Sequence, residues 1–127
     1  MQNPKDYKYT KQHEWVKLNG DIATVGITNH AQELLTDIVF VELPELETDV
    51  EQNGNLGVVE SVKSVSDIYS PISGRIMEVN NELETAPELI NSSPFDKGWI
   101  AKIEINNINE MDDLMASEDY DKLIAGE

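Results

Sequence analysis

The sequence predicts a mainly β protein built from two small antiparallel sheets with short helices. Most apolar residues alternate with polar ones at a period of two, which is typical of half-buried strands. Asn19-Gly20 and Asn53-Gly54 are strong signals for tight turns between such strands. The apolar period lengthens near the C-terminus, where short helices are expected. The 127 residues suffice for one hydrophobic core, so we expect a single domain over residues 1–127.

The alternating runs predict seven strands. Residues 14–18 and 22–27 flank the first Asn-Gly turn and are expected to pair as a hairpin. Five further runs have the same alternation: residues 37–43, 56–62, 65–69, 73–79 and 98–105.

Helices are expected where the alternation breaks. Within residues 28–35, Asn29 followed by Gln32 resembles a capping box, which predicts one short helix. A second capping box at residues 85–88, with proline inside the first turn, predicts a helix through Ile90.

The C-terminal residues 109–126 have apolar side chains at helical spacing. The pattern is interrupted near Ser117, which is a plausible N-cap, so two short helices are predicted. No catalytic constellation occurs in them, and we expect them to cover one edge of the sheet.

The charge balance excludes several classes of partner. There are nine basic residues against 25 acidic ones, a formal net charge of −16. No basic stripe could neutralise nucleic-acid phosphates or an anionic membrane, so neither partner is expected. The absence of cysteine excludes disulfides and thiolate nucleophiles. No apolar run approaches membrane-spanning length and no signal peptide is apparent, so we expect a protein of a bacterial cytoplasm. Nothing in the sequence suggests a symmetric interface, so we expect a monomer.

Lys63 is the residue most suggestive of chemistry. It lies between two predicted strands, where a hairpin would carry it to an exposed tip. A primary amine on a flexible stem at a rigid turn is what a modifying enzyme needs to attach a carboxylic-acid cofactor. The alternative is an ordinary solvated surface lysine, the commonest state of this residue type. Four apolar residues are expected to anchor the hairpin arms: Val58, Val62, Val65 and Ile68.

Seven short strings occur in a characteristic order and spacing along the chain. They are Tyr9–Val16, Val25–Thr28, Asp37–Pro44, Glu60–Lys63, Ser70–Gly74, Asn91–Pro94 and Gly98–Trp99. Together they resemble the family of glycine cleavage system H proteins, and the resemblance extends over about residues 7 to 125. An ordered set of this kind is far more specific than any one motif.

The resemblance implies a fold, a cofactor and a function. The fold would be a lipoyl/biotinyl-type barrel-sandwich hybrid, with residues 22–105 as its core and residues 109–126 as C-terminal helices. Lys63 would carry lipoate in amide linkage. The protein would be a lipoyl carrier of glycine catabolism, without catalytic machinery of its own.

The same resemblance implies a set of partners. The lipoyl arm would receive an aminomethyl group from glycine decarboxylase (P protein) and present it to aminomethyltransferase (T protein). Dihydrolipoamide dehydrogenase (L protein) would then reoxidise the arm. A lipoate-attaching enzyme would load Lys63.

Two carboxylates and two histidines are the remaining candidate site residues. The family likeness implies that the loaded arm folds into a cleft near the N-terminal strand, where Glu14 and Asp67 could hold its ammonium group. The alternative is that each is one of many surface acids. His13 and His30 lie on different predicted elements with no third ligand signalled nearby, so no metal site is expected.

Other interpretations stay open at the level of sequence. Biotin carriers usually flank the lysine with methionines, and lipoyl domains of 2-oxoacid dehydrogenases have an acidic residue before it, whereas Val62 and Ser64 flank Lys63 here. An H-like scaffold could relay lipoate to other lipoyl-dependent or redox-response systems, and a non-acylated interaction module could retain the fold. Thr36 and Glu47 depart from the family by replacing common glycines, which puts local backbone geometry in doubt.

Overall fold

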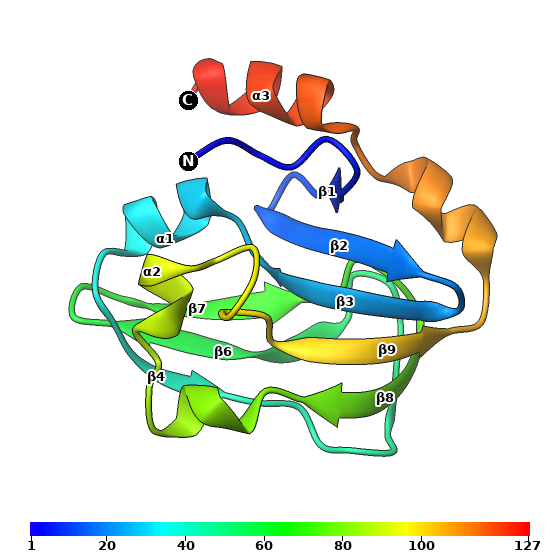
Figure 1. Cartoon of the computed structure of the whole chain (residues 1–127), viewed down its shortest axis with the longest axis horizontal. Helices are drawn as coiled ribbons and strands as arrows, with labels where there is room; N and C mark the ends of the chain where they lie inside the picture. Colours follow the sequence, from blue (N-terminus) through cyan, green and yellow to red (C-terminus); the bar gives the residue numbers. More distant parts are fainter.

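Nine strands form two antiparallel sheets in the computed structural model, which describes residues 1–127 (Figure 1). The six-stranded sheet has the order β1 (Lys8–Tyr9), β2 (Glu14–Asn19), β3 (Ile22–Ile27), β9 (Ala101–Ile105), β8 (Gly74–Val79) and β5 (Asp49–Val50). The three-stranded sheet has the order β4 (Ile38–Glu42), β6 (Asn55–Ser61) and β7 (Val65–Tyr69). The predicted mainly β architecture of two antiparallel sheets is therefore confirmed.

Five short helical segments connect and flank the strands. They are α1 (Asn29–Leu35), η1 (Asn81–Glu84), α2 (Leu89–Ser92), η2 (Ile108–Asp113) and α3 (Ser117–Ala125), of which η1 and η2 are 3₁₀ helices. The two-residue strands β1 and β5 and the helix η1 were not predicted, because so few residues have no recognisable period. None of the helices has the length and apolar character needed to cross a lipid bilayer.

The helix caps differ from those that the sequence predicts. Thr28 caps α1, because its Oγ1 accepts a hydrogen bond from the Ala31 amide at 3.1 Å. The predicted capping box at residues 85–88 is wrong, since Thr85 ends η1 and the helix begins only at Leu89. Ser117 is already the first residue of α3, so the cap position falls one residue earlier.

The main hydrophobic core contains 17 buried residues contributed by both sheets, among them Val25, Val59, Ile76 and Ile103. A second cluster consists of four aromatic residues, Tyr9, Trp15, Phe95 and Tyr120. In it, the rings of Tyr9 and Tyr120 stack with centroids 4.8 Å apart. The second cluster ties the C-terminal helix to the N-terminal part of the chain.

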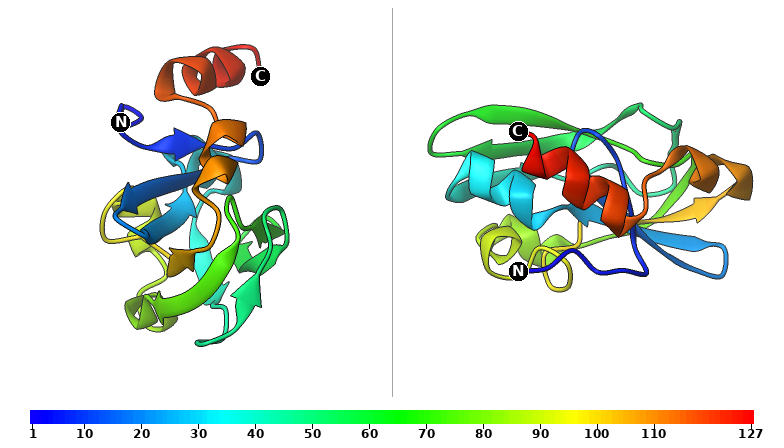
Figure 2. Two further views of the ribbon diagram at one scale, coloured as in Figure 1. Left: turned by 90° about the vertical axis from the view of Figure 1, so that its right-hand side faces the viewer. Right: turned by 90° about the horizontal axis from the view of Figure 1, so that it is seen from above.

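The C-terminal segment covers one edge of the larger sheet, as predicted. The edge strand β1 forms an antiparallel bridge with this segment through two backbone hydrogen bonds between Tyr9 and Met115, of 2.9 and 2.8 Å. Helix α3 then lies across the N-terminal residues on the same side of the molecule (Figures 1 and 2). The sheet edge is therefore not left open to pair with another chain.

Trp15 brings three of the strings noted in the sequence into contact. It pairs with Gly26 across β2 and β3, and a Cβ atom at Gly26 would lie 2.7 Å from the indole ring. The indole N–H donates to the carbonyl of Pro94 at 2.9 Å. Residue 26 must therefore lack a side chain for Trp15 to cross the sheet and reach the 91–94 segment.

Thr36 and Glu47, the two departures from the family's glycines, both adopt positive φ. Their φ values are 66° and 62°. This region of conformational space favours glycine, and Thr36, with ψ of −149°, is in a part of it that a β-branched residue rarely adopts. The fold is kept, and the strain falls on two connections between elements.

Replacing Thr36 with glycine is expected to stabilise the protein by about 1 kcal/mol, because relief of backbone strain exceeds the entropy cost of a glycine. Both backbone hydrogen bonds of residue 36, to Gln32 and Asn91, are kept by glycine. Thr85 offers a matched control, since it too ends a helix but has φ of −105°. Chemical denaturation should show Thr36→Gly raising the unfolding free energy and Thr85→Gly lowering it. Equal losses of unfolding free energy in both variants would contradict the inference that the backbone at Thr36 is strained.

Candidate functional site

Lys63 lies in the turn between β6 and β7, at the end of a hairpin that projects from the smaller sheet (Figure 1). The last strand pair is Glu60 with Val65. Beyond it, the Ser61 amide donates to the Ser64 carbonyl at 2.8 Å and closes the turn. Lys63 is thus at a bend and not within a strand, as the sequence predicts.

The hydroxyl of Ser61 holds the backbone of this turn. Its Oγ accepts from the amide of Lys63 at 3.1 Å and from the amide of Ser64 at 3.0 Å. A serine hydroxyl that accepts from the amides two and three residues later is a recognised turn motif. The amide of Val62 also donates to the carbonyl of Asp37 at 3.0 Å, which ties the turn to the chain just before β4.

The side chain of Lys63 is exposed along its length. Its Nζ donates one hydrogen bond of 3.1 Å to the carbonyl of Leu34, in the last turn of α1. A helix C-terminus attracts a cation, so this contact is electrostatically favourable, but it is a single exposed bond and holds the amine weakly. The amine is therefore accessible to a modifying enzyme.

The hairpin is anchored by fewer apolar residues than predicted. Of the four predicted anchors, Ile68 is buried, at 2% exposure, and Val58 is half-buried. Val59, which was not predicted, is buried at 1% and fixes the base of the hairpin to the core together with Ile68. Val62 and Val65 are 69% and 65% exposed, so the prediction that they anchor the arms is wrong. The reason is that β6 ends at Ser61, which leaves Val62 in the turn, and Val65 opens β7 beside the turn.

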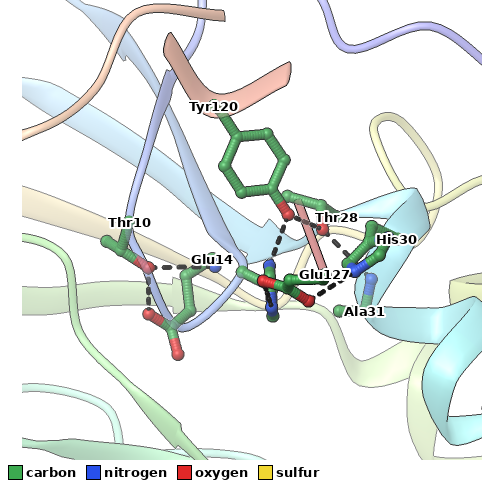
Figure 3. A network of polar contacts seen from close by, with 8 residues as sticks. Thr10, Glu14, Thr28, His30, Ala31, Tyr120 and Glu127 are labelled. Carbon is green, nitrogen blue, oxygen red and sulfur yellow. Dashed lines mark hydrogen bonds and ion pairs between the residues drawn. The ribbon is translucent and has the colours of Figure 1, made fainter. Parts of the chain in front are cut away.

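Glu14 is buried, which excludes the interpretation that it is a plain surface acid. It is 3% exposed at the start of β2. Its Oε1 accepts from the hydroxyl of Thr10 at 2.6 Å, and its Oε2 accepts from the amide of Tyr69 at 3.3 Å. Burial raises the pKa of this carboxyl, and the two hydrogen bonds act in the opposite direction. Figure 3 shows Thr10 and Glu14 beside each other.

Asp67 lies on the strand that Glu14 contacts but does not touch Glu14. It is exposed, pairs with Val58, and lies two residues before Tyr69, so Asp67 and Tyr69 share one face of β7. The structure thus brings Glu14 to the strand that carries Asp67 and leaves the two carboxylates in very different environments.

Thr10 was not singled out in the sequence, yet it is the closest partner of Glu14. A threonine four residues before a carboxylate in a short turn is a weak signal, because threonine hydroxyls bind local backbone groups in many loops. Here the hydroxyl both donates to the carboxylate and accepts from the Glu14 amide at 3.1 Å. Thr10 also lines a surface cavity of about 390 Å³ together with Gln52 and Asn53, and neither Glu14 nor Asp67 lines it.

The two histidines lie on different elements, as expected, but they meet in space. The rings of His13 and His30 are 4.8 Å apart between centroids. Glu127 contacts both, with 3.3 Å to His13 Nε2 and 2.9 Å to His30 Nε2. Glu127 is thus a third potential ligand near both histidines that the sequence does not signal. The reason is that 97 residues separate Glu127 from His30, and only the packing of α3 brings them together.

Burial has the largest effect on the His13 imidazole and lowers its pKa, while Glu127 raises it and His30 lowers it further. Its Nδ1 lies 2.7 Å from the hydroxyl of Tyr120, which in turn lies 2.7 Å from Thr28 Oγ1. Figure 3 shows Tyr120, Thr28, His30 and Glu127 in this network. These contacts link α1, α3 and the turn before β2.

The carboxyl pKa of Glu14 should lie above 4.5, its ordinary value, in a ¹³C NMR titration. Since the folded state then holds this proton more tightly than the unfolded state, the associated stability is complete below pH 4.5. It is lost as pH rises through the folded-state pKa. Thr10→Val removes a hydrogen bond that lowers the pKa and should raise it further. A Glu14 pKa at or below 4.5 would contradict the effect of burial.

Comparisons with known proteins agree over nearly the whole chain. The family model for the glycine cleavage H-protein matches residues 7–127. The glycine cleavage system H protein of Staphylococcus carnosus is 50% identical over 124 residues, covering 98% of each chain. That of Carboxydothermus hydrogenoformans is 49% identical over 98% of this chain and 95% of its own.

Solved structures show the same likeness. The crystal structure of a glycine cleavage system H protein from Mycobacterium marinum superposes with a TM-score of 0.89 at 36% identity. The match covers 97% of this chain and 99% of that one. The chain therefore belongs to the glycine cleavage H-protein family, the lipoyl carriers of the glycine cleavage system, and is a carrier component rather than an enzyme.

Proposed function

We propose that Lys63 is the lysine that bears the lipoyl group, in amide linkage through Nζ. The observation that supports this most directly is an exposed primary amine in a turn whose backbone is closed by Ser61. The neutral amine attacks the carbonyl carbon of an activated lipoyl donor, the activating group leaves from that carbon, and Nζ loses a proton as the amide forms. The amide carries no charge, so the charge-assisted part of the contact with the Leu34 carbonyl is lost. When bound, the lipoyl group supplies a disulfide that can accept an aminomethyl group and two electrons.

The hairpin suits a carrier because it combines a fixed base with a free arm. A tethered group acts through its effective concentration at each active site, which depends on reach and on where the tether begins. Val59 and Ile68 hold the base of the hairpin in the core. The lysine stem and the attached chain beyond it are free to rotate in solvent.

The exposed valines beside Lys63 support a second part of the proposal. Val62 and Val65 give the hairpin tip an apolar surface. The protein as a whole is acidic, with a net charge of −16. We assign this tip as the part that enters the partner enzymes, which are glycine decarboxylase (P protein), aminomethyltransferase (T protein), dihydrolipoamide dehydrogenase (L protein) and a lipoate-attaching enzyme. Complementary charge speeds such encounters and apolar contact prolongs them.

Glu14 and Asp67 are proposed to hold the ammonium group of the loaded arm. Glu14 is a desolvated carboxylate with both oxygens already oriented, by Thr10 and by the Tyr69 amide. A nearby ammonium would offset the burial that raises its pKa, so the charged arm and the charged carboxylate stabilise one another. Asp67 adds an exposed carboxylate on the same strand as Tyr69.

We further propose that the chain acts as one domain and as a monomer in the bacterial cytoplasm. All residues of the continuous core except Val16 fall within residues 22–105, which supports this range as the carrier core. The aromatic cluster supports residues 109–126 as its C-terminal cover. The bacterial sources of the similar proteins support the location.

Lys63→Arg should abolish lipoylation while leaving the fold intact, because a guanidinium is not a usable nucleophile at ordinary pH. Intact mass spectrometry after expression with lipoate and a lipoate-attaching enzyme measures this. Lys97→Arg, a matched change at another exposed lysine, should gain one lipoyl mass as the parent chain does. A lipoyl-sized addition to the Lys63→Arg protein would overturn the assignment.

Loss of either carboxylate should speed the decay of the aminomethyl-loaded protein to ammonia and formaldehyde. Glu14→Gln removes the desolvated charge and is expected to raise the decay rate about tenfold, the effect of losing one charge-assisted hydrogen bond. Asp67→Asn should have a smaller effect because the side chain is exposed. Release of ammonia over time measures both, with Asp49→Asn as a control. Parent-like decay in both variants would rule out the proposed ammonium site.

A further inference from the structure

His13, His30 and Glu127 converge from three distant parts of the chain. His13 precedes β2, His30 lies in α1, and Glu127 follows α3. Each residue offers one potential ligand atom, and these three atoms lie within 4.8 Å of one another. The two carboxylate oxygens of Glu127 divide between the rings, with Oε1 toward His30 and Oε2 toward His13. Figure 3 shows His30 and Glu127 directed toward each other.

The hydrogen bonds behind His13 orient its ring, with Nδ1 2.7 Å from the Tyr120 hydroxyl, and are compatible with a ligating tautomer. Thr28 Oγ1 accepts from the Ala31 amide, and the Tyr120 hydroxyl lies between Thr28 and His13. When Tyr120 donates to Thr28, it accepts from His13, so the ring proton lies on Nδ1 and the lone pair of Nε2 faces Glu127. A histidine oriented through its second nitrogen is the usual arrangement at metal sites.

In that tautomer the lone pair of His13 Nε2 and the Glu127 carboxylate repel one another unless a cation lies between them. A divalent metal ion binds neutral imidazole and carboxylate together and needs no proton on either ligating nitrogen. The three ligand atoms lie within 4.8 Å of one another, so one metal ion can take the place of that cation.

Two imidazole nitrogens and one carboxylate oxygen are the donor set of open zinc sites, in which water takes the fourth position. Tetrahedral Zn²⁺ with bonds of about 2.0–2.1 Å places its ligand atoms about 3.3 Å apart. The Glu127 oxygens already lie 2.9 and 3.3 Å from the two Nε2 atoms, so only the widest separation among the three ligand atoms, at most 4.8 Å, must shorten, by up to about 1.5 Å. His30 and Glu127 are partly exposed, at 21% and 37%, so their side chains are free to make this adjustment.

We propose that His13, His30 and Glu127 bind one Zn²⁺ ion that fastens the end of α3 to α1 and to the turn before β2. This site is separate from Lys63 and independent of lipoylation. The bound ion would hold in place the N-terminal turn of residues 10–14, which includes Thr10 and Glu14. Metal binding to the folded state alone raises stability in proportion to the logarithm of metal concentration.

Calorimetric titration of the full-length, unlipoylated chain with zinc chloride, in a buffer free of chelators, tests the site. One Zn²⁺ per chain is expected. His30→Gln and Glu127→Gln should each weaken binding at least about tenfold, as expected when one ligand of the site is lost. Glu118→Gln, an equal change of charge on exposed α3, should leave binding unchanged. Absence of saturable binding, or equal binding by all four proteins, would overturn the proposal.

Two further measurements distinguish this site from other sources of zinc binding. Magnesium chloride is the probe for non-specific attraction to the acidic surface, because Mg²⁺ has the same charge but prefers oxygen ligands. It should neither bind one per chain nor displace Zn²⁺. Zinc should also raise the melting temperature of the Lys63→Arg protein by as much as it raises that of the parent protein. It should leave the melting temperature of the Glu127→Gln protein unchanged. Zinc binding that is lost in Lys63→Arg would contradict a site at the histidines.

Discussion

The hydroxyl-closed turn at residues 61–64 is the constraint on which the carrier function depends. Antiparallel strands β6 and β7 determine where the hairpin ends, and the Ser61 hydroxyl fixes the backbone at that end by accepting from the amides of Lys63 and Ser64. The Val62 amide adds a tie to Asp37 on the neighbouring segment. The lysine stem then begins from a defined point, and only the stem and what it carries need to move. A floppy turn would spread the arm over more volume and lower its effective concentration at each enzyme.

The N-terminal turn is the second organising element, because it connects the aromatic cluster, the hairpin strand and the C-terminal helix. Glu14 reaches β7 through the Tyr69 amide, and His13, next to it in sequence, reaches α3 through Tyr120. Residues beyond the two-sheet core therefore shape the surroundings of the carrier strand. The C-terminal helix also covers an edge strand, so the same packing protects the sheet from pairing with other chains.

Local patterns predicted most strands and the hairpin tip, because alternation and turn residues report on neighbours in sequence. They did not predict that Val62 and Val65 are exposed, since both are apolar and only the face turned toward the core distinguishes them from Val59. The burial of Glu14 and the convergence of His13, His30 and Glu127 depend on contacts between distant segments, which no local pattern contains. The positive φ of Thr36 was signalled only by comparison with the glycine that the family favours at that place.

Backbone ¹⁵N relaxation of the lipoylated protein tests most directly whether a rigid turn carries a mobile arm. Because of the hydrogen bonds to Ser61, we expect order parameters of about 0.85 for the amides of residues 61–64. The amides of β6 and β7 should have the same values. The Lys63 side chain should be mobile in the same sample, because it has one exposed contact in the unmodified protein. Order parameters below about 0.6 throughout the turn would contradict a fixed origin for the arm.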